Sequence, residues 1–205
     1  MTPPIFVAQD IGAPHLSGAT EQNGPTVTIT AGGADIWGNR DECHFAHVPV
    51  AGDFDLSVRI AALEMADTYT KAGLMLRASL DPGAPHVMLL SFGDNQPRNK
   101  NNGALEFQSR LAAQGDCTGI YPPQPLSPKP DFPASFPDHW LRLTRQGGTL
   151  TGSFSTDGQM WRTFCTHIQA FPGTALLGLA VTSHNEARTV RASFQHLTFG
   201  PRSNP

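Results

Sequence analysis

The chain has 205 residues, of which 39% are apolar and 15% are charged, and its formal net charge is −3 at neutral pH. This length fits one large all-β domain with a sizeable core. The weak negative charge gives no reason to expect a nucleic acid or an acidic membrane surface as a partner. No apolar run reaches the ~20 residues of a membrane-spanning helix. The first residues lack the features of a secretory signal, so the sequence predicts a cytoplasmic protein, or a secreted one if a signal has been removed.

Short runs of alternating apolar and polar residues recur along the chain, and no window sustains the apolar stripe of an amphipathic helix. The predicted strands, in chain order, are 26–30, 54–63, 71–76, 86–92, 104–111, 140–145, 149–155, 161–168, 175–184 and 189–199. Gly147-Gly148 and Asp157-Gly158 are typical hairpin turns between neighbouring strands. Many short strands with turns between them indicate an all-β sandwich or barrel.

The remaining segments are predicted to be irregular. Residues 114–138 contain seven prolines and little alternation, which indicates a long Pro-rich loop in a single domain spanning 1–205. The ends, up to about Gly24 and after Gly200, are predicted to be irregular arms. The three cysteines are too few for a disulfide framework. We expect three buried free thiols, with one bridge and one leftover thiol as the alternative.

Six segments form one pattern along the chain, namely 32–38, 43–45, 52–60, 71–79, 154–161 and 178–185. In this order they resemble a family of concanavalin A-like domains of unknown function that is common in bacterial proteins. Distant relatives are named "regulation of enolase protein", and the C-terminal domain of β-xylosidases is a further relative. The resemblance covers about Gly12 to Phe199. It implies a two-sheet antiparallel β-sandwich of the jelly-roll, concanavalin A-like kind, and it implies no settled activity.

The chain departs from that family near its last strand. Related domains usually carry Phe-Asp-Asn there, with an Asp suited to calcium, whereas this chain has Phe194-Gln195-His196. A Gln ligates calcium only through a neutral carbonyl, which argues against calcium at this position. The eight histidines lack the paired spacing of zinc ligands. The sequence therefore predicts no metal and no cofactor, with calcium as a disfavoured alternative.

Alternation along the strands separates core-facing side chains from outward-facing ones. In 71–77, Ala72, Leu74 and Leu76 are assigned to the core, which leaves Lys71 and Arg77 on the outer face. The same reasoning directs outward a further set of polar side chains, namely Glu106, Gln108, Arg110, Thr182, His184 and, with Phe45 taken as core, His44.

The outer face of one sheet is therefore a candidate binding surface. Polar planar groups along such a face suit sugar hydroxyls or carboxylates, and Trp37 is a candidate for stacking on a sugar ring. The predicted ligand-binding residues are His44, Lys71, Arg77, Glu106, Arg110, His184 and Trp37. An alternative remains that these are ordinary solvated residues of antiparallel strands.

The sequence favours a binding module over an enzyme. It contains no Glu-x-Asp-x-x-Glu strand, no Gly-x-Ser-x-Gly turn and no cysteine in a basic context. We expect a non-catalytic module that binds carbohydrate or another small polar ligand. A first alternative is a hydrolase or lyase acting on a sugar or uronide, in which His44, Lys71 or His184 transfers protons while Arg77 and Arg110 hold a carboxylate. A second alternative is a protein-interaction domain.

Overall fold

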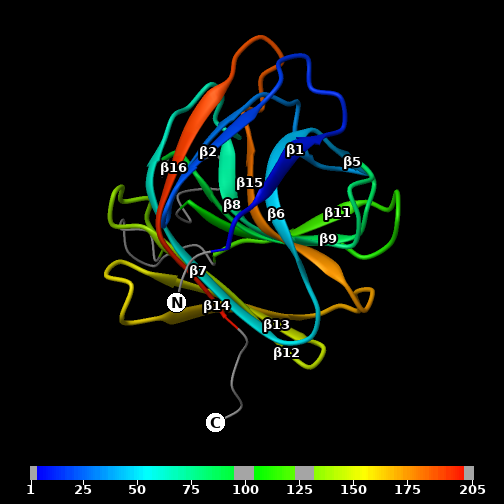
Figure 1. Cartoon of the computed structure of the whole chain (residues 1–205), viewed down its shortest axis with the longest axis vertical. Helices are drawn as coiled ribbons and strands as arrows, with labels where there is room; N and C mark the ends of the chain where they lie inside the picture. Colours follow the sequence, from blue (N-terminus) through cyan, green and yellow to red (C-terminus); the bar gives the residue numbers. More distant parts are fainter. Residues whose placement is uncertain (1–3, 95–103, 123–131, 201–205) are drawn as a thin grey trace.

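The computed structural model describes residues 4–94, 104–122 and 132–200. Within these ranges the chain forms strands and turns (Figure 1), and no helix is long and apolar enough to cross a membrane. Most strands belong to two seven-stranded antiparallel sheets. Sheet I has the order β1 (Val7–Ile11), β6 (Cys43–Val50), β15 (Ala175–Thr182), β8 (Lys71–Arg77), β9 (His86–Phe92), β10 (Leu105–Arg110) and β11 (Cys117–Ile120).

Sheet II lies against sheet I. Its order is β14 (Arg162–Ile168), β13 (Thr149–Ser155), β12 (Trp140–Gln146), β7 (Phe54–Leu63), β16 (Val190–Gly200), β3 (Thr26–Ala31) and β2 (Ala19–Asn23). The long strand β16, orange to red in Figure 1, pairs with both β7 and β3. A separate short hairpin is formed by β4 (Ile36–Trp37) and β5 (Arg40–Asp41). The fold is the predicted two-sheet antiparallel sandwich.

The main hydrophobic core lies between the two sheets. On β8 it takes Ala72, Leu74 and Leu76, the set that alternation assigns to the core. In sheet II the alternation is equally clear, since Val27 and Ile29 of β3 are fully buried while the three threonines that alternate with them are half-buried. Residues i and i+2 of a strand share a face, so the period-two pattern is sufficient to identify the inner face here.

Sheet I, unlike sheet II, is buried on both faces in its centre. Every residue of β8, β9 and β10 is buried. A second apolar cluster lies on the face of sheet I that points away from sheet II, called here the outer face. Its members include Phe45, Met75, Met88 and Leu90, and Leu80 packs against it. The β4–β5 hairpin and the loop 78–85 cover part of this outer face, so it is not the solvated surface that one-sided alternation predicts.

Several strands lie where the sequence predicts irregular chain. Strands β1 and β2 are in the N-terminal arm, and β11 is inside the Pro-rich segment 114–138, whose residues 123–131 lie outside the described part. Each of the three is an edge strand with one neighbour in its sheet. An edge strand buries few side chains, so its apolar alternation is weak and it is easily overlooked.

Candidate functional site

A pocket of about 310 Å³ opens on the outer face of sheet I. Four aromatic side chains and five polar ones line it, and they come from six separate parts of the chain: Asp35, Trp37, Tyr69, Lys71, Phe92, Glu106, Gln108, Tyr121 and His184. We call this cavity the outer-face pocket. Three of its aromatic residues remain partly open to solvent, with Trp37 37%, Tyr121 39% and Tyr69 45% exposed.

Lys71 of β8 contacts pocket residues from two other parts of the chain, the β4–β5 hairpin region and β9. Its Nζ is 2.7 Å from Asp35 Oδ1, and it donates a hydrogen bond of 3.4 Å to the carbonyl of Ile36. The ammonium also lies 6.0 Å from the ring centre of Trp37 and 5.8 Å from that of Phe92. A buried ammonium requires such compensation, because burial removes its hydration. Lys71 is therefore neutralised by groups of the protein itself.

His184 closes one side of the outer-face pocket between two carboxylates. Its Nε2 is 3.4 Å from Asp35 Oδ2, and its Nδ1 is 3.0 Å from Asp67 Oδ1. The imidazole ring lies 5.2 Å from the Tyr69 ring, and the residue has a positive φ of 53°. Asp35 thus contacts both Lys71 and His184, and this ties the loop after β15 to the hairpin that begins at Ile36.

Glu106 and Gln108 of β10 form the floor of the pocket. Within the described part of the chain, neither Nε2 nor Oε1 of the fully buried Gln108 has a hydrogen-bond partner. Gln108 pairs in register with Gly119 of β11. A Cβ at Gly119 would lie 2.7 Å from Glu106 Oε1 and 3.0 Å from the Tyr121 hydroxyl. The glycine therefore leaves room for the Glu106 and Tyr121 side chains to approach each other over the sheet.

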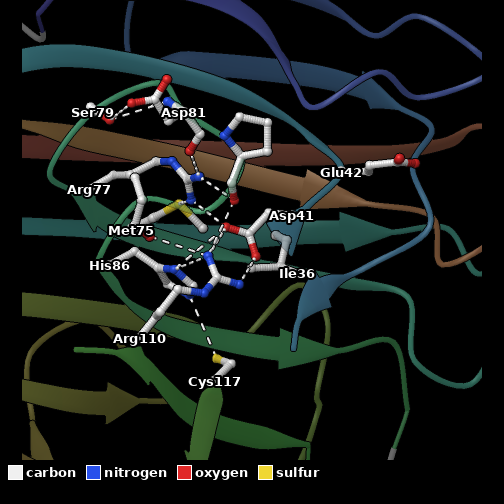
Figure 2. A network of polar contacts seen from close by, with 12 residues as sticks. Ile36, Asp41, Glu42, Met75, Arg77, Ser79, Asp81, His86, Arg110 and Cys117 are labelled. Carbon is white, nitrogen blue, oxygen red and sulfur yellow. Dashed lines mark hydrogen bonds and ion pairs between the residues drawn. The ribbon is translucent and has the colours of Figure 1, made fainter. Parts of the chain in front are cut away.

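Arg77 and Arg110 do not line this pocket, because a buried carboxylate of the protein binds both of them (Figure 2). Asp41 Oδ2 accepts hydrogen bonds from Arg77 Nη1 at 2.5 Å and from Arg110 Nη1 at 2.7 Å. Asp41 Oδ1 accepts a third from Arg110 Nη2 at 2.7 Å. All three side chains are fully buried. The prediction that the two arginines are accessible for a ligand is wrong, because their carboxylate partner is internal.

Backbone carbonyls complete this buried ion cluster. Arg110 donates to the carbonyls of Trp37, Gly38 and Ala84, and Arg77 donates to those of Asp81 and Pro82. The cluster therefore holds the β4–β5 hairpin and the loop 78–85 onto the outer face. Because Trp37 lies on that hairpin and Asp35 directly precedes it, the two arginines position one wall of the outer-face pocket.

Burial and charge set the protonation states in the cluster. Burial alone would raise the pKa of Asp41, but the hydrogen bond from Arg110 and the charges of Arg77 and Arg110 hold it below its usual value. Burial lowers the pKa of His86 to about 3, and the two arginine charges act in the same direction. Asp41 is therefore ionised and His86 neutral at neutral pH.

His44 lies elsewhere, on the inner side of sheet I. It faces Val181 of the main core in register, and its ring reaches the edge of both sheets. Its Nδ1 is 2.7 Å from Asp10 Oδ1, and its Nε2 is 3.0 Å from the Thr20 hydroxyl. Its predicted place on the outer face is wrong, because Phe45 belongs to the outer apolar cluster and not to the core between the sheets.

The three cysteines are free thiols, of which Cys43 and Cys117 are buried as predicted while Cys165 is half-buried, and burial raises the pKa of each. For Cys117 and Cys165 the pKa is about 12, so neither thiol ionises readily.

Among the residues that the structure describes, no group of three or more His, Cys, Asp or Glu side chains is arranged to hold a metal ion. At the position considered for calcium, Gln195 pairs in register with Arg59 of β7, and the His196 ring stacks on Trp140.

Of the seven predicted site residues, four share the outer-face pocket, namely Trp37, Lys71, Glu106 and His184. Sequence reasoning directed Gln108 to the same face but did not select it. It missed Phe92 and Tyr69, and it missed Tyr121 because the residue follows an edge strand within the Pro-rich segment. Asp35 was not selected from the sequence either. Its Oδ1 accepts a hydrogen bond from the Ile36 amide, and the same atom is 2.7 Å from Lys71 Nζ.

The fold is a concanavalin A-like β-sandwich, and its outer-face pocket is lined by aromatic and hydrogen-bonding side chains. No family model matches the chain, and no curated protein matches it by sequence. Among solved structures, a functionally unknown protein from Saccharomyces cerevisiae is similar, with a TM-score of 0.72, 17% identity and 98% of each chain covered. The carbohydrate-binding module CBM66 from Bacillus subtilis has a TM-score of 0.57 at 13% identity, with 94% of each chain covered.

A third similar structure is the exoplasmic/lumenal domain of VIP36 in its Ca²⁺/Man3GlcNAc-bound form. It has a TM-score of 0.51 at 13% identity, and the match covers 98% of this chain and 86% of that one. At these identities the likeness concerns the fold alone.

Proposed function

We propose that the protein is a non-catalytic module that binds carbohydrate in the outer-face pocket. The observation that carries this proposal is the buried Gln108 amide on the pocket floor, which has no partner for either polar atom within the described residues. A buried amide without partners is costly, and a ligand that both accepts and donates hydrogen bonds would remove that cost. A sugar hydroxyl does both.

The pocket walls support the same ligand class. Trp37, Tyr69 and Tyr121 present partly exposed rings around the polar floor. Flat aromatic faces suit the apolar faces of a sugar ring, while a few polar groups set its orientation. The volume of about 310 Å³ is at the lower end of ligand pockets, which favours one sugar ring over a long segment of polymer.

The comparisons add support at the level of fold. One similar structure is named a carbohydrate-binding module, and another contains a bound oligosaccharide. Both share the sandwich architecture with this chain. The assignment to this chain rests on the pocket, since one fold accommodates many functions.

A glycan array followed by calorimetric titration tests the proposal. We expect wild-type protein to bind at least one glycan, and Trp37→Ala and Gln108→Leu each to weaken that binding about tenfold or more, a loss of the order of one good hydrogen bond or ring contact. Trp161→Ala is the matched control, because Trp161 contacts Arg142 on sheet II and does not line the pocket. Equal binding by all four proteins, or no glycan bound, would refute the proposal.

One observation favours a second candidate, a sugar hydrolase or lyase. Asp35, Glu106 and His184 line a single pocket, and paired carboxylates with a histidine are groups that transfer protons. Asp35, however, already contacts Lys71 and His184 with its two oxygens, which suits a structural charge better than a nucleophile. Release of reducing or unsaturated sugar from polysaccharides, abolished by Glu106→Gln, would support this candidate.

A further inference from the structure

The amide on the floor of the outer-face pocket indicates which part of a sugar the pocket binds. We propose that the pocket recognises a vicinal diol, meaning two hydroxyls on adjacent ring carbons, through Oε1 and Nε2 of Gln108 together. This inference rests on the proposed function, because it names the chemical group by which the same pocket holds its sugar. It goes beyond that function in requiring two neighbouring hydroxyls, whereas the proposed function requires only that a saccharide binds.

The position of Gln108 in sheet I explains why its amide is left for a ligand. The side chain is fully buried, and within the described part of the chain neither polar atom has a hydrogen bond. Gln108 pairs in register with Met88, which belongs to the outer apolar cluster, and with Gly119, which has no side chain. Arg110, two residues along β10 on the same face, is engaged by Asp41. The amide therefore lies on the pocket floor beside strand neighbours that do not bond it.

The geometry of an amide determines what it can bind with both atoms. Oε1 accepts a hydrogen bond and Nε2 donates one, and the two atoms lie side by side in one plane. A single hydroxyl aligns well with only one of them, because hydrogen bonds weaken steeply away from linear geometry. Two hydroxyls on adjacent ring carbons, unless both are axial, also lie side by side, and each can donate or accept. One then donates to Oε1 while the other accepts from Nε2.

An acetamido group, a common polar substituent of sugars, does not match the Gln108 amide in this way. Its secondary amide is trans, so its N–H and its carbonyl point in opposite directions and cannot both reach one side chain. The pocket walls also suit the diol, since Trp37, Tyr69 and Tyr121 present partly exposed rings beside the floor. A sugar that packs one ring face against such a wall can direct its edge, where neighbouring hydroxyls project, toward Gln108.

Deoxy sugars test the two contacts separately. Methyl glycosides of glucose, galactose and mannose, and derivatives of each that lack one hydroxyl in turn, are titrated calorimetrically into the whole chain and into its Gln108→Met variant. For a glycoside that binds, we expect two derivatives, deoxygenated at adjacent carbons, each to bind wild-type protein ~10-fold more weakly, the effect of one hydrogen bond. In Gln108→Met the same two losses should be ~3-fold or less, because the amide to which those hydroxyls bond is absent.

A stability measurement distinguishes a binding amide from a structural one. Gln108→Met removes a buried polar group without partners, so the melting temperature of the ligand-free protein is expected to rise by about 2–4 °C. Gln169→Met is the matched control. The Gln169 amide is also buried, but it donates to the Arg110 carbonyl at 2.9 Å and its Oε1 lies 3.1 Å from His167 Nε2. This control is expected to lower the melting temperature by at least ~2 °C and to leave glycoside affinity unchanged.

Each outcome decides one of the two proposals. Deoxygenation losses that are equal in wild type and Gln108→Met overturn the diol and leave carbohydrate binding standing. So does a coupling of Gln108 to one hydroxyl alone, or to two on carbons that are not adjacent. A Gln108→Met variant that melts below wild type, or fails to fold, also overturns the diol, because the amide then has a structural role. If no glycoside binds wild-type protein, the proposed function fails and the diol inference fails with it.

Discussion

Asp41 is the residue whose role is most sharply defined by its surroundings. It is fully buried and faces two buried guanidinium groups, so the cluster has an excess positive charge that backbone carbonyls solvate. Replacing a buried ion pair by apolar groups is often harmless, but removing one partner leaves an uncompensated charge. The two arginines therefore depend on this single carboxylate.

Asp41→Asn is expected to destabilise the protein by about 3–5 kcal/mol, because it leaves Arg77 and Arg110 buried without a counter-charge. Urea unfolding followed by tryptophan fluorescence measures this. Asp55→Asn is the matched control, because Asp55 pairs with Arg142 at a partly exposed position where a salt bridge contributes about 0–1 kcal/mol. Similar losses in both variants would contradict the role given to the buried cluster.

At the scale of elements, the β4–β5 hairpin connects stability to the candidate site. Asp41 on β5 is held by the buried arginines, while Trp37 on β4 forms a wall of the outer-face pocket. Gly33, just before the hairpin, has a φ of 111°, and a Cβ there would lie 2.2 Å from the Glu42 carbonyl. Two-residue strands have few ladder hydrogen bonds of their own. The hairpin is therefore held by the contacts of Asp41 with the arginines and by the close approach of Gly33 to the Glu42 carbonyl.

A second element-scale feature closes the sandwich at one edge. His44 of β6 connects Asp10 of β1, in sheet I, to Thr20 of β2, in sheet II. The Gly18 amide also donates to both oxygens of Asp10, at 3.0 and 3.1 Å. Edge strands have only one neighbour in their sheet, so such side-chain contacts between sheets hold them in place.

Thr20→Val tests this edge contact. The variant keeps the shape of the side chain but leaves the Nε2 of the buried His44 ring without its 3.0 Å partner, and it is expected to cost about 1–3 kcal/mol of unfolding free energy. Thr28→Val on the neighbouring strand β3, where the side chain faces outward between Val27 and Ile29, should change stability by less than about 0.5 kcal/mol. Hydrogen exchange of β1 and β2 amides should increase only in the first variant.

At the scale of the whole molecule, buried histidines make stability depend on pH. Burial lowers the pKa of His86 to about 3 and that of His139 to about 4. In the unfolded chain both titrate near the ordinary histidine value of about 6.5. Between these values the unfolded state binds protons that the folded state does not. Stability is therefore full above pH ~6.5 and falls as the pH drops toward 4.

His139→Phe is expected to flatten this decline. The ring lies 5.2 Å from both Phe136 and Phe154, so an aromatic replacement keeps the packing. The variant should match wild type within about 1 kcal/mol at pH 8, allowing for the lost hydrogen bond to the Pro133 carbonyl. At pH 4 it should gain about 3 kcal/mol relative to wild type, the linkage value of the shift. Parallel stability curves for the two proteins from pH 8 to pH 4 would contradict this.

The alternation of apolar and polar residues correctly predicted strand bounds and strand faces, and the glycine-containing dipeptides correctly predicted two hairpin turns. The strand predicted over 86–92 is β9 with the same bounds, and the strand over 149–155 is β13. The hairpin glycines Gly147 and Gly158 have positive φ values of 59° and 72°. The inner face of β8 is also as predicted, because successive side chains of a strand must point to opposite faces.

The candidate site was predicted only in part, because alternation does not say what covers a face. Arg77 and Arg110 were correctly directed outward, yet the hairpin that carries Asp41 buries them. The error at His44 has a related cause. Sheet I has apolar residues on both faces, so an apolar neighbour such as Phe45 does not mark the inner one.

Local sequence patterns were sufficient to predict the all-β architecture, the inner faces of the central strands and the hairpin turns. These three features follow from the period of a strand and the φ preference of glycine. Which charges are neutralised and which polar groups meet depends on tertiary contacts, because Asp35, Lys71, Gln108 and His184 are far apart in sequence and converge through strand pairing. The outer-face pocket is a product of that convergence.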